Sequence, residues 1–295
     1  MKKLITKAML IVALICLVAT LAVGFAACGG EKDSNKLYVG LECAYSPFNY
    51  TQRDASNGAV PIYNTNYKPI ARSYANGYDV MIAKQIAEEL GKELVVVKMD
   101  FNALIPAVQA GTVDLIIAGM SPTAERKEEI DFSDAYYQSN LVLVVRKDGD
   151  FANATSLKDF NNAKIAAQQG TFHDDALQAQ AAQYGIKAQT PLSDFAALIN
   201  ALDTKTIDAY VAEEPGAIEN CASNDAFTYI PLKNNETGFT ASEEDTAIAV
   251  GIKKGSDLTA QINTILAQIT QNQRDEMMRL ATELASGTNI VPDEE

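Results

Sequence analysis

The chain has 295 residues and a formal net charge of −14, because 38 Asp and Glu outnumber 24 Lys and Arg. A chain this acidic is not expected to bind nucleic acid or an anionic membrane surface through its charge. Its single histidine, His173, excludes a multi-histidine metal site, and we expect neither a metal nor another cofactor. The length suggests two domains or lobes.

The N-terminus has the order of a secretory signal peptide. Lys2, Lys3 and Lys7 precede an uncharged, mostly apolar run over residues 8–27, and small residues lead into Cys28. This end is similar to the lipobox of bacterial lipoproteins, in which the cysteine is lipidated, for example with palmitate, and becomes the first mature residue. We therefore predict a signal peptide over 1–27 and a lipid anchor and tether over 28–35. An uncleaved transmembrane anchor is the alternative. Either arrangement places the rest of the chain outside the cytoplasm.

The next segment alternates strand and helix patterns. Strands are predicted over 36–41, 93–99 and 113–118, and helices over 79–90 and 102–110. We expect Asp79 and Asn102 to cap these two helices. Residues 51–76 are rich in Asn, Tyr, Ser and Gly without periodicity, and this composition predicts a surface loop or insertion.

A second alternating unit follows. Strands are predicted over 141–146, 163–168, 206–212 and 246–252, and helices over 174–184, 194–202, 215–222, 257–269 and 275–284. The whole pattern predicts an α/β fold of two lobes joined by two crossing strands, with a cleft between them. Lobe 1 would comprise 36–140 plus 246–295, and lobe 2 would comprise 141–245.

One polar segment stands directly after the predicted strand 113–118. Gly119 allows close approach to the backbone, and Ser121 and Thr123 offer hydroxyls that can cap a helix. Arg126 follows within one turn, and its guanidinium matches a carboxylate in shape. Ligands of α/β folds gather at the carboxyl ends of strands. The segment therefore predicts a site for the carboxylate of a small molecule.

Several motifs together resemble the extracellular solute-binding protein family 3, the polar-amino-acid receptors of ABC importers. They are Tyr45-Ser46-Pro47-Phe48, Gly77-Tyr78-Asp79-Val80, Phe101-Asn102-Ala103-Leu104-Ile105-Pro106-Ala107, Gly119 to Arg126, Ile130 to Tyr137, Gln169-Gly170-Thr171, Ile207-Asp208-Ala209 and Glu213-Glu214-Pro215. The resemblance covers nearly the whole mature chain. It implies a type II periplasmic-binding fold, hinge closure on a free amino acid, and delivery to a membrane permease with its ATPase by a monomeric receptor.

The resemblance also assigns roles in the site. Arg126 would hold the ligand's α-carboxylate, helped by backbone N–H groups of Ser121 and of Thr171-Phe172. Gly119, Ser121 and Glu213 would hold the α-ammonium, and many relatives carry Asp at the position of Glu213. Tyr45 and Phe101 would enclose the ligand side chain, with Phe48 as packing. The full set of expected ligand-binding residues is Glu42, Tyr45, Phe101, Gly119, Met120, Ser121, Arg126, Gly170, Thr171, Phe172 and Glu213.

Glu42 lies where relatives place an acid at the deep end of the side-chain pocket, which favours lysine or arginine, with glutamine next. A dehydratase on the same fold is an alternative, but the acids and bases near the cleft form no catalytic pair, so we expect no enzyme. A sensory domain is a third hypothesis, disfavoured because no signalling domain follows. His173 is expected at the edge of the site. Cys43 and Cys221 are either two thiols or a disulfide.

Overall fold

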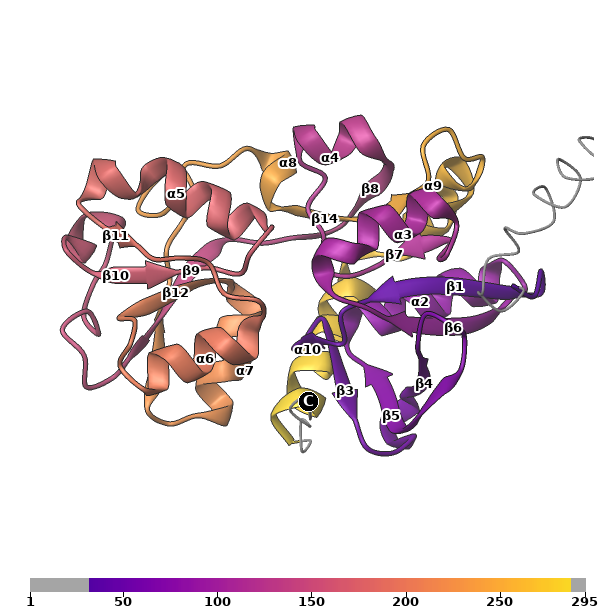
Figure 1. Cartoon of the computed structure of the whole chain (residues 1–295), viewed down its shortest axis with the longest axis horizontal. Helices are drawn as coiled ribbons and strands as arrows, with labels where there is room; N and C mark the ends of the chain where they lie inside the picture. Colours follow the sequence, from indigo (N-terminus) through magenta and orange to yellow (C-terminus); the bar gives the residue numbers. More distant parts are fainter. Residues whose placement is uncertain (1–31, 288–295) are drawn as a thin grey trace, which may run out of the picture. The chain divides into compact units, whose positions relative to one another are not determined.

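The computed structural model describes residues 32–287 and contains two β-sheets (Figure 1). The larger sheet has the strand order β2-β3-β5-β4-β6-β1-β7-β14-β8, and the smaller has the order β11-β10-β12-β9-β13. The strands of the larger sheet are β1 Lys36–Leu41, β2 Ala44–Tyr45, β3 Asn49–Gln52, β4 Val60–Tyr63, β5 Pro69–Asn76, β6 Glu93–Lys98, β7 Leu115–Ile116, β8 Asp131–Gln138 and β14 Ala247–Ile252. Those of the smaller sheet are β9 Leu141–Arg146, β10 Lys164–Ala166, β11 Lys187–Ala188, β12 Ala209–Glu213 and β13 Phe227–Ile230.

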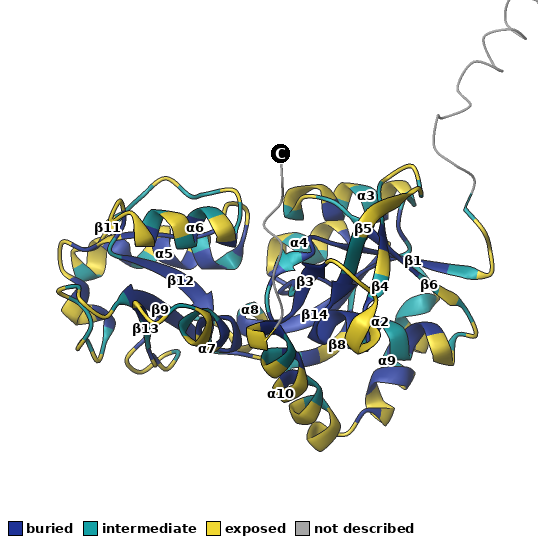
Figure 2. Ribbon diagram, turned by 90° about the horizontal axis from the view of Figure 1, so that it is seen from below, coloured by how far each residue is buried: buried dark blue, intermediate teal, exposed yellow. Residues whose placement is uncertain are grey.

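Helices pack on both faces of each sheet, so most of the strands are buried on both sides. The helices are α2 Tyr78–Glu89, α3 Leu104–Ala110, α4 Ala124–Glu129, α5 Phe172–Tyr184, α6 Phe195–Asp203, α7 Glu214–Ser223, α8 Glu243–Thr246, α9 Leu258–Gln268 and α10 Gln271–Gly287, with short 3-10 turns η1 Ser56–Gly58, η2 Phe101–Ala103 and η3 Leu157–Phe160. Figure 2 shows buried strands beneath helices whose outer faces are exposed. This mixed α/β architecture confirms the predicted fold class.

Alternation along the strands sends side chains to opposite faces. In β1, Leu37, Val39 and Leu41 join the apolar cluster that includes α2, whereas Tyr38 joins the cluster of α3. In the smaller sheet, α5 packs on one face, and α6 and α7 pack on the other (Figure 1). Each sheet therefore has an apolar layer on both faces, which fixes its strand register.

The chain passes between the sheets twice. β8 ends in the larger sheet at Gln138, and β9 begins in the smaller sheet at Leu141. The return runs from β13 through α8 into β14. The two passages are joined, because the Ser139 N–H donates to the Thr246 carbonyl at 3.1 Å.

The prediction of a surface loop over residues 51–76 is wrong. The segment contains η1, β4 and β5, and β5 lies between β3 and β4 in the larger sheet. Most side chains of β5 are exposed or half-buried. Because its backbone ladders rather than apolar side chains hold this strand, the sequence carries no alternating pattern that would reveal it.

The two predicted helix caps are also wrong. Gly77 occupies the cap position of α2 with φ of 120°, and an added Cβ there would lie 2.4 Å from the Phe48 carbonyl oxygen. Asp79 instead lies fully buried and accepts hydrogen bonds from Asn49 Nδ2 and the Tyr136 hydroxyl, each at 2.7 Å. Burial raises the pKa of Asp79 to about 7. Asn102 lies within η2, and α3 begins only at Leu104.

Cys43 and Cys221 are not joined by a disulfide. Cys43 is buried next to the end of β1, and Cys221 is half-buried on α7. Burial raises the pKa of the Cys221 thiol to about 11, so this group is a poor nucleophile at neutral pH. Both cysteines therefore act as small packing residues in this structure.

Candidate functional site

A small cavity collects polar side chains from strand ends and helix starts of both sheets. Its free volume is about 20 Å³, room for about one water molecule. The residues that line it are Glu42, Tyr45, Phe101, Ala118, Gly119, Ser121, Arg126, Gln168, Thr171, Phe172, His173, Phe195 and Glu213. Segments of both sheets supply these groups, and a free volume this small has no room for an amino acid.

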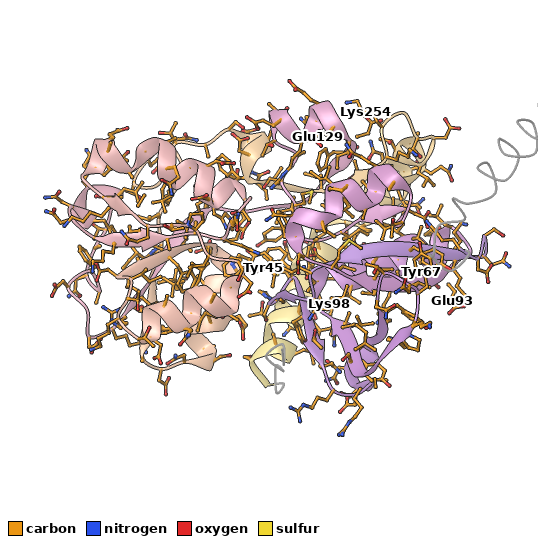
Figure 3. All side chains as sticks on the ribbon, viewed as in Figure 1. Tyr45, Tyr67, Glu93, Lys98, Glu129 and Lys254 are labelled. Atoms are coloured by element: carbon orange, nitrogen blue, oxygen red, sulfur yellow. The ribbon has the colours of Figure 1, made fainter. Side chains whose placement is uncertain are left out.

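Figure 3 shows where this edge of the larger sheet lies. It labels Tyr45, on β2, and the two ends of β6, where Lys98 marks the carboxyl end and Glu93 the other. The ends of β1 and β7 lead into Glu42 and Gly119. Carboxyl ends of neighbouring parallel strands thus meet here, as in other open α/β sheets that bind ligands.

Arg126 lies in the first turn of α4, after a cap that the sequence predicts. The Thr123 side chain accepts a hydrogen bond from the Arg126 N–H, which fixes the start of the helix. The half-buried guanidinium donates to the carbonyl oxygens of Ser121, at 2.8 Å, and Gly170, at 3.0 Å. It also lies 5.3 Å from the centre of the Phe101 ring. Burial lowers the pKa of Arg126 to about 10, so the group stays cationic at neutral pH.

Both of these hydrogen-bond partners are neutral carbonyls. They orient the guanidinium but do not neutralise its charge, and the remaining donors of the fork are left for another acceptor. A carboxylate would supply both the negative charge and a matching two-oxygen geometry.

Glu213 and His173 form a buried pair on the side of the cavity that the smaller sheet supplies. Glu213 ends β12, and His173 lies in the first turn of α5. His173 Nε2 lies 2.8 Å from Glu213 Oε1, and each side chain is 7% exposed. Burial raises the pKa of Glu213 to about 8, and burial together with the positive charge of Arg126 lowers that of His173 to about 3.

Three buried polar atoms that line this cavity have no hydrogen-bond partner among residues 32–287. They are the Tyr45 hydroxyl, Glu213 Oε2 and His173 Nδ1. Buried polar atoms are usually satisfied, and leaving one unsatisfied costs about 1–3 kcal/mol. Such a cluster at the wall of one cavity indicates a site for a polar ligand.

Another part of the cavity wall is acidic and aromatic. Glu42 is 8% exposed, and its Oε1 accepts a hydrogen bond from Gln168 Nε2 at 2.8 Å. Burial raises the pKa of Glu42 to about 7, opposed by the hydrogen bond from Gln168, and the nearby charges of Asp194 and Asp100 raise it further. The Tyr45 ring stacks on Phe195, with ring centres 4.5 Å apart.

Nine of the predicted site residues line this one cavity, and two do not. The Met120 side chain packs in the apolar cluster beneath the larger sheet. Gly170 contributes only its carbonyl, which accepts from Arg126, and its φ is +72°. An added Cβ on Gly170 would lie 2.0 Å from Asn102 Oδ1, so this position requires glycine. Phe48 is fully buried against Tyr78 and Tyr137, in agreement with a packing role.

Sequence reasoning missed Gln168, Phe195 and Ala118, and it placed His173 only at the edge. Gln168 follows β10 and Phe195 begins α6, directly after the capping residue Asp194. Each stands at a strand end or a helix start of the smaller sheet. The rule that ligands gather at carboxyl ends of strands could have found Gln168, whereas Phe195 is revealed only by packing.

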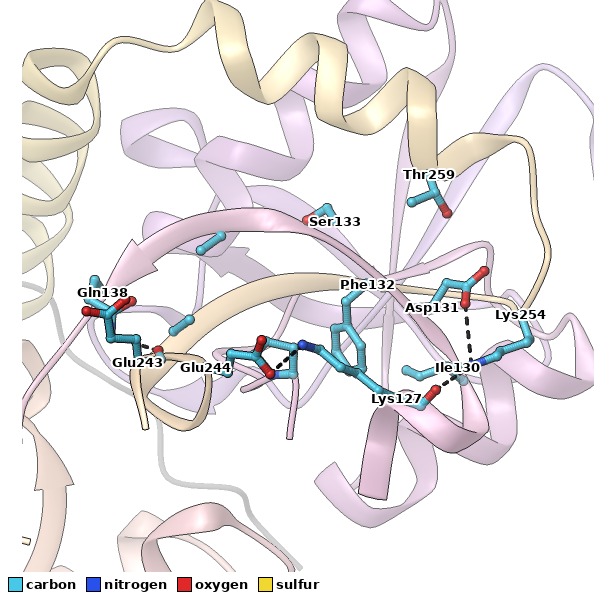
Figure 4. Close-up of a pocket in the computed structure, with 13 residues that line it drawn as sticks. Lys127, Ile130, Asp131, Phe132, Ser133, Gln138, Glu243, Glu244, Lys254 and Thr259 are labelled. Carbon is cyan, nitrogen blue, oxygen red and sulfur yellow. Dashed lines mark hydrogen bonds and ion pairs between the residues drawn. The ribbon is translucent and has the colours of Figure 1, made fainter. Parts of the chain in front are cut away.

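A second, larger hollow lies along β8 and the start of β14 (Figure 4). Its volume is about 610 Å³, but both of the lysines that line it are paired with an acid. Lys127 Nζ lies 2.6 Å from Glu244, and Lys254 Nζ lies 3.6 Å from Asp131. Exposed, mutually paired charges carry little unmet binding capacity, so we do not assign the ligand site here.

The fold and the small cavity define a solute-binding protein of the bilobed periplasmic-binding class. Residues 62–171 match the bacterial extracellular solute-binding proteins, family 3. The arginine-binding extracellular protein ArtP of Bacillus subtilis is 30% identical over 92% of this chain and 95% of its own length. The chain therefore belongs to the bacterial extracellular solute-binding proteins, family 3.

Two further similar proteins differ in the amino acid that they bind. The structure of the ABC transporter substrate-binding protein AbpA from Streptococcus pneumoniae bound to L-arginine has a TM-score of 0.70 and 28% identity, covering 85% of this chain and 96% of that one. The glutamine-binding protein GlnH of Bacillus subtilis is 29% identical over 67% of this chain and 69% of its own. Both relatives belong to ABC transporters, and the family of this chain makes it an extracytoplasmic solute-binding protein.

Proposed function

We propose that the protein binds a free cationic amino acid, L-arginine first, in the small cavity. The observation that supports this most strongly is the distribution of buried charge in one cavity. Arg126 offers a cation, Glu213 offers a carboxyl whose Oε2 has no partner among residues 32–287, and Glu42 offers a second carboxyl. L-Arginine carries the complementary carboxylate, ammonium and guanidinium.

In this proposal Arg126 binds the ligand α-carboxylate and Glu213 binds the α-ammonium. A zwitterion leaves water at a high cost unless both charges are matched. Arg126 follows a strand of the larger sheet and Glu213 ends a strand of the smaller one. Only an arrangement that brings both together satisfies the ligand, so binding favours closure. We propose 36–140 plus 246–295 and 141–245 as the two lobes that close.

The side-chain end favours a guanidinium over an amide. Glu42 lies among the acids Asp100 and Asp194, and a cation relieves the repulsion that raises its pKa. The Tyr45 ring, stacked on Phe195, offers an aromatic face beside it. Glutamine is the second candidate, because Glu42 titrates near pH 7 and a protonated Glu42 can exchange hydrogen bonds with an amide.

The way in which the protein is held at the membrane is also a proposal. Lipidation of Cys28, with palmitate among its acyl chains, would anchor a monomer to the outer face of the bacterial cytoplasmic membrane and keep it near its permease and ATPase. Cys28 and the apolar run 8–27 lie outside the described residues. Within residues 32–287, no helix combines the length and the apolar character needed to cross a bilayer.

A thermal-shift screen of the purified protein against the twenty amino acids tests the proposal. A ligand of the folded state raises Tm with the logarithm of its concentration over Kd. We expect the largest shift with L-arginine, a smaller one with L-lysine or L-glutamine, and none with L-aspartate. If L-glutamine gave the largest shift, the proposed receptor function would stand and L-glutamine would replace L-arginine as the proposed ligand. No shift with any amino acid would contradict the proposal.

A further inference from the structure

His173 contacts the one carboxyl group that the proposed function assigns to the ligand's α-ammonium. Its Nε2 lies 2.8 Å from Glu213 Oε1, and both side chains line the cavity. Glu213 Oε2 has no partner in the described part of the chain. The two oxygens of this carboxyl group thus differ, since one is held by the protein and the other lies at the cavity wall.

The imidazole is itself held in place from two directions. α5 begins at Phe172, after Thr171, whose hydroxyl donates to the Gln168 carbonyl at 2.7 Å. The His173 ring meets Phe195 edge to face, with ring centres 6.1 Å apart at 79°. A ring fixed by helix geometry and by an aromatic neighbour can orient the group that it contacts, as ligand-orienting partners do around other sites.

We propose that His173 is a positioning residue for ligand capture, in which its Nε2 holds Oε1 of Glu213 so that Oε2 receives the ligand's α-ammonium. The inference rests on the proposed function. A glutamate has one more rotatable bond than an aspartate, so this longer arm needs a partner that limits its conformations. His173 supplies that partner from the same lobe, before any ligand is present.

The same geometry links binding to pH. The charged and titratable groups that share the cavity with the pair are Arg126 from α4, Glu42 after β1 and Tyr45 from β2. With its pKa near 8, Glu213 is mostly protonated at pH 7 before the ligand arrives. The positive charge of the ligand's α-ammonium stabilises the ionised form of Glu213, so Glu213 releases its proton to solvent when the ligand binds. An Nε2–H that donates to the carboxylate makes this loss easier.

Two substitutions separate positioning from packing. His173→Gln places an amide Nε2 at about the same reach as the imidazole Nε2 and retains the donor. His173→Leu fills space without a donor. Asp174→Asn, one residue along the same helical turn and outside the cavity lining, is the control.

Calorimetric Kd values for L-arginine, or for L-glutamine if that is the ligand, should weaken about 10- to 100-fold in His173→Leu. We expect His173→Gln and Asp174→Asn to stay within about threefold of wild type, because each keeps its polar contacts. Tm without ligand is measured for all variants. Equal losses in His173→Leu and His173→Gln, or no loss in either, would overturn the inference.

The pH profile is the readout that a packing role alone would not move. Wild-type affinity for L-arginine should rise from pH 6 to pH 8, as Glu42 and then Glu213 lose their protons, and then level off. In His173→Leu the loss of the donor should move this rise to higher pH, whereas His173→Gln should keep it in place. A profile unchanged in His173→Leu would overturn the inference alone. A wild-type protein that binds neither amino acid would overturn the proposed function and this inference with it.

Discussion

Two of the hollows in the described part of the chain differ in binding capacity, and the smaller of them has the greater capacity. The larger, of about 610 Å³, is open and lined by lysines that already face Glu244 and Asp131. The smaller, of about 20 Å³, holds buried charges and three unpartnered polar atoms. Binding capacity depends on buried groups that lack a matching charge, because those groups gain most from a ligand. The volume of a cavity in this one arrangement of the chain is therefore a poor guide to its capacity to bind a ligand.

The largest expected effect is the loss of ligand affinity when Arg126, in the small cavity, is replaced. Arg126→Ala leaves the ligand α-carboxylate without its counter-charge, which should cost about 3–5 kcal/mol of binding free energy. Calorimetry with L-arginine measures it. The Tm without ligand should change little, since the guanidinium donates to the neutral carbonyl oxygens of Ser121 and Gly170 and otherwise lies over the Phe101 ring. Affinity close to wild type would remove Arg126 from the site.

The second prediction concerns the acidic end of the cavity. Glu42→Gln keeps the size of the side chain and removes its negative charge, so it should weaken L-arginine by about 1.5–3 kcal/mol. L-Glutamine should be affected far less, because an amide can exchange hydrogen bonds with another amide. Parallel titrations with both amino acids give the ranking. If the ranking is unchanged, Glu42 does not contact the ligand side chain.

The third prediction concerns the stability of the ligand-free protein with pH. Glu213 has a folded-state pKa of about 8, above its ordinary value of 4.5, so the folded state holds its proton more tightly than the unfolded state. The stability from this group is fully present below pH 4.5 and is lost as pH rises through 8. Tm should therefore fall between pH 5 and pH 8.5.

Glu213→Gln provides the comparison, because a glutamine cannot titrate and the repulsion of the acidic surface affects both proteins alike. We expect a smaller fall of Tm in this variant over the same pH range. Equal falls in wild type and variant would show that Glu213 does not titrate in the folded protein as its burial requires.

The smallest effect is expected in the large hollow. Lys127→Ala removes the ion pair with Glu244, whose side chains are 41% and 66% exposed. Exposed pairs contribute about 0–1 kcal/mol, so stability should change by no more than that and L-arginine affinity should not change. Denaturant unfolding measures the change in stability, and calorimetry measures the affinity for L-arginine. A loss of affinity comparable with Arg126→Ala would place function in this hollow instead.

The sequence predicts the α/β alternation well, because buried strands and amphipathic helices follow apolar periods. It fails at β5, where side chains are mostly exposed and the strand is held by backbone pairing. The prediction for Asp79 also fails, because this residue, of a type common at helix caps, is buried and accepts a hydrogen bond from the Tyr136 hydroxyl. Tertiary contacts decide both positions.

In the site, too, some residues can be placed from the local sequence and others only from tertiary contacts. Glu42 directly follows β1, and Arg126 lies in α4, the first helix after β7, so the sequence order places both at the carboxyl side of two neighbouring parallel strands. The contacts of Gln168 with Glu42, of Phe195 with Tyr45 and of His173 with Glu213 join segments far apart in the chain. Their partners depend on how helices pack, and the local sequence contains no such information.

The central claim, that Arg126 and Glu213 together recognise an α-amino acid, is tested most directly by comparing L-arginine with agmatine in calorimetry on the wild-type protein. Agmatine keeps the guanidinium but lacks the α-carboxylate. We predict that L-arginine binds and that agmatine binds at least about 100-fold more weakly, because Arg126 is left unpaired. Equal affinity for the two compounds would contradict the account.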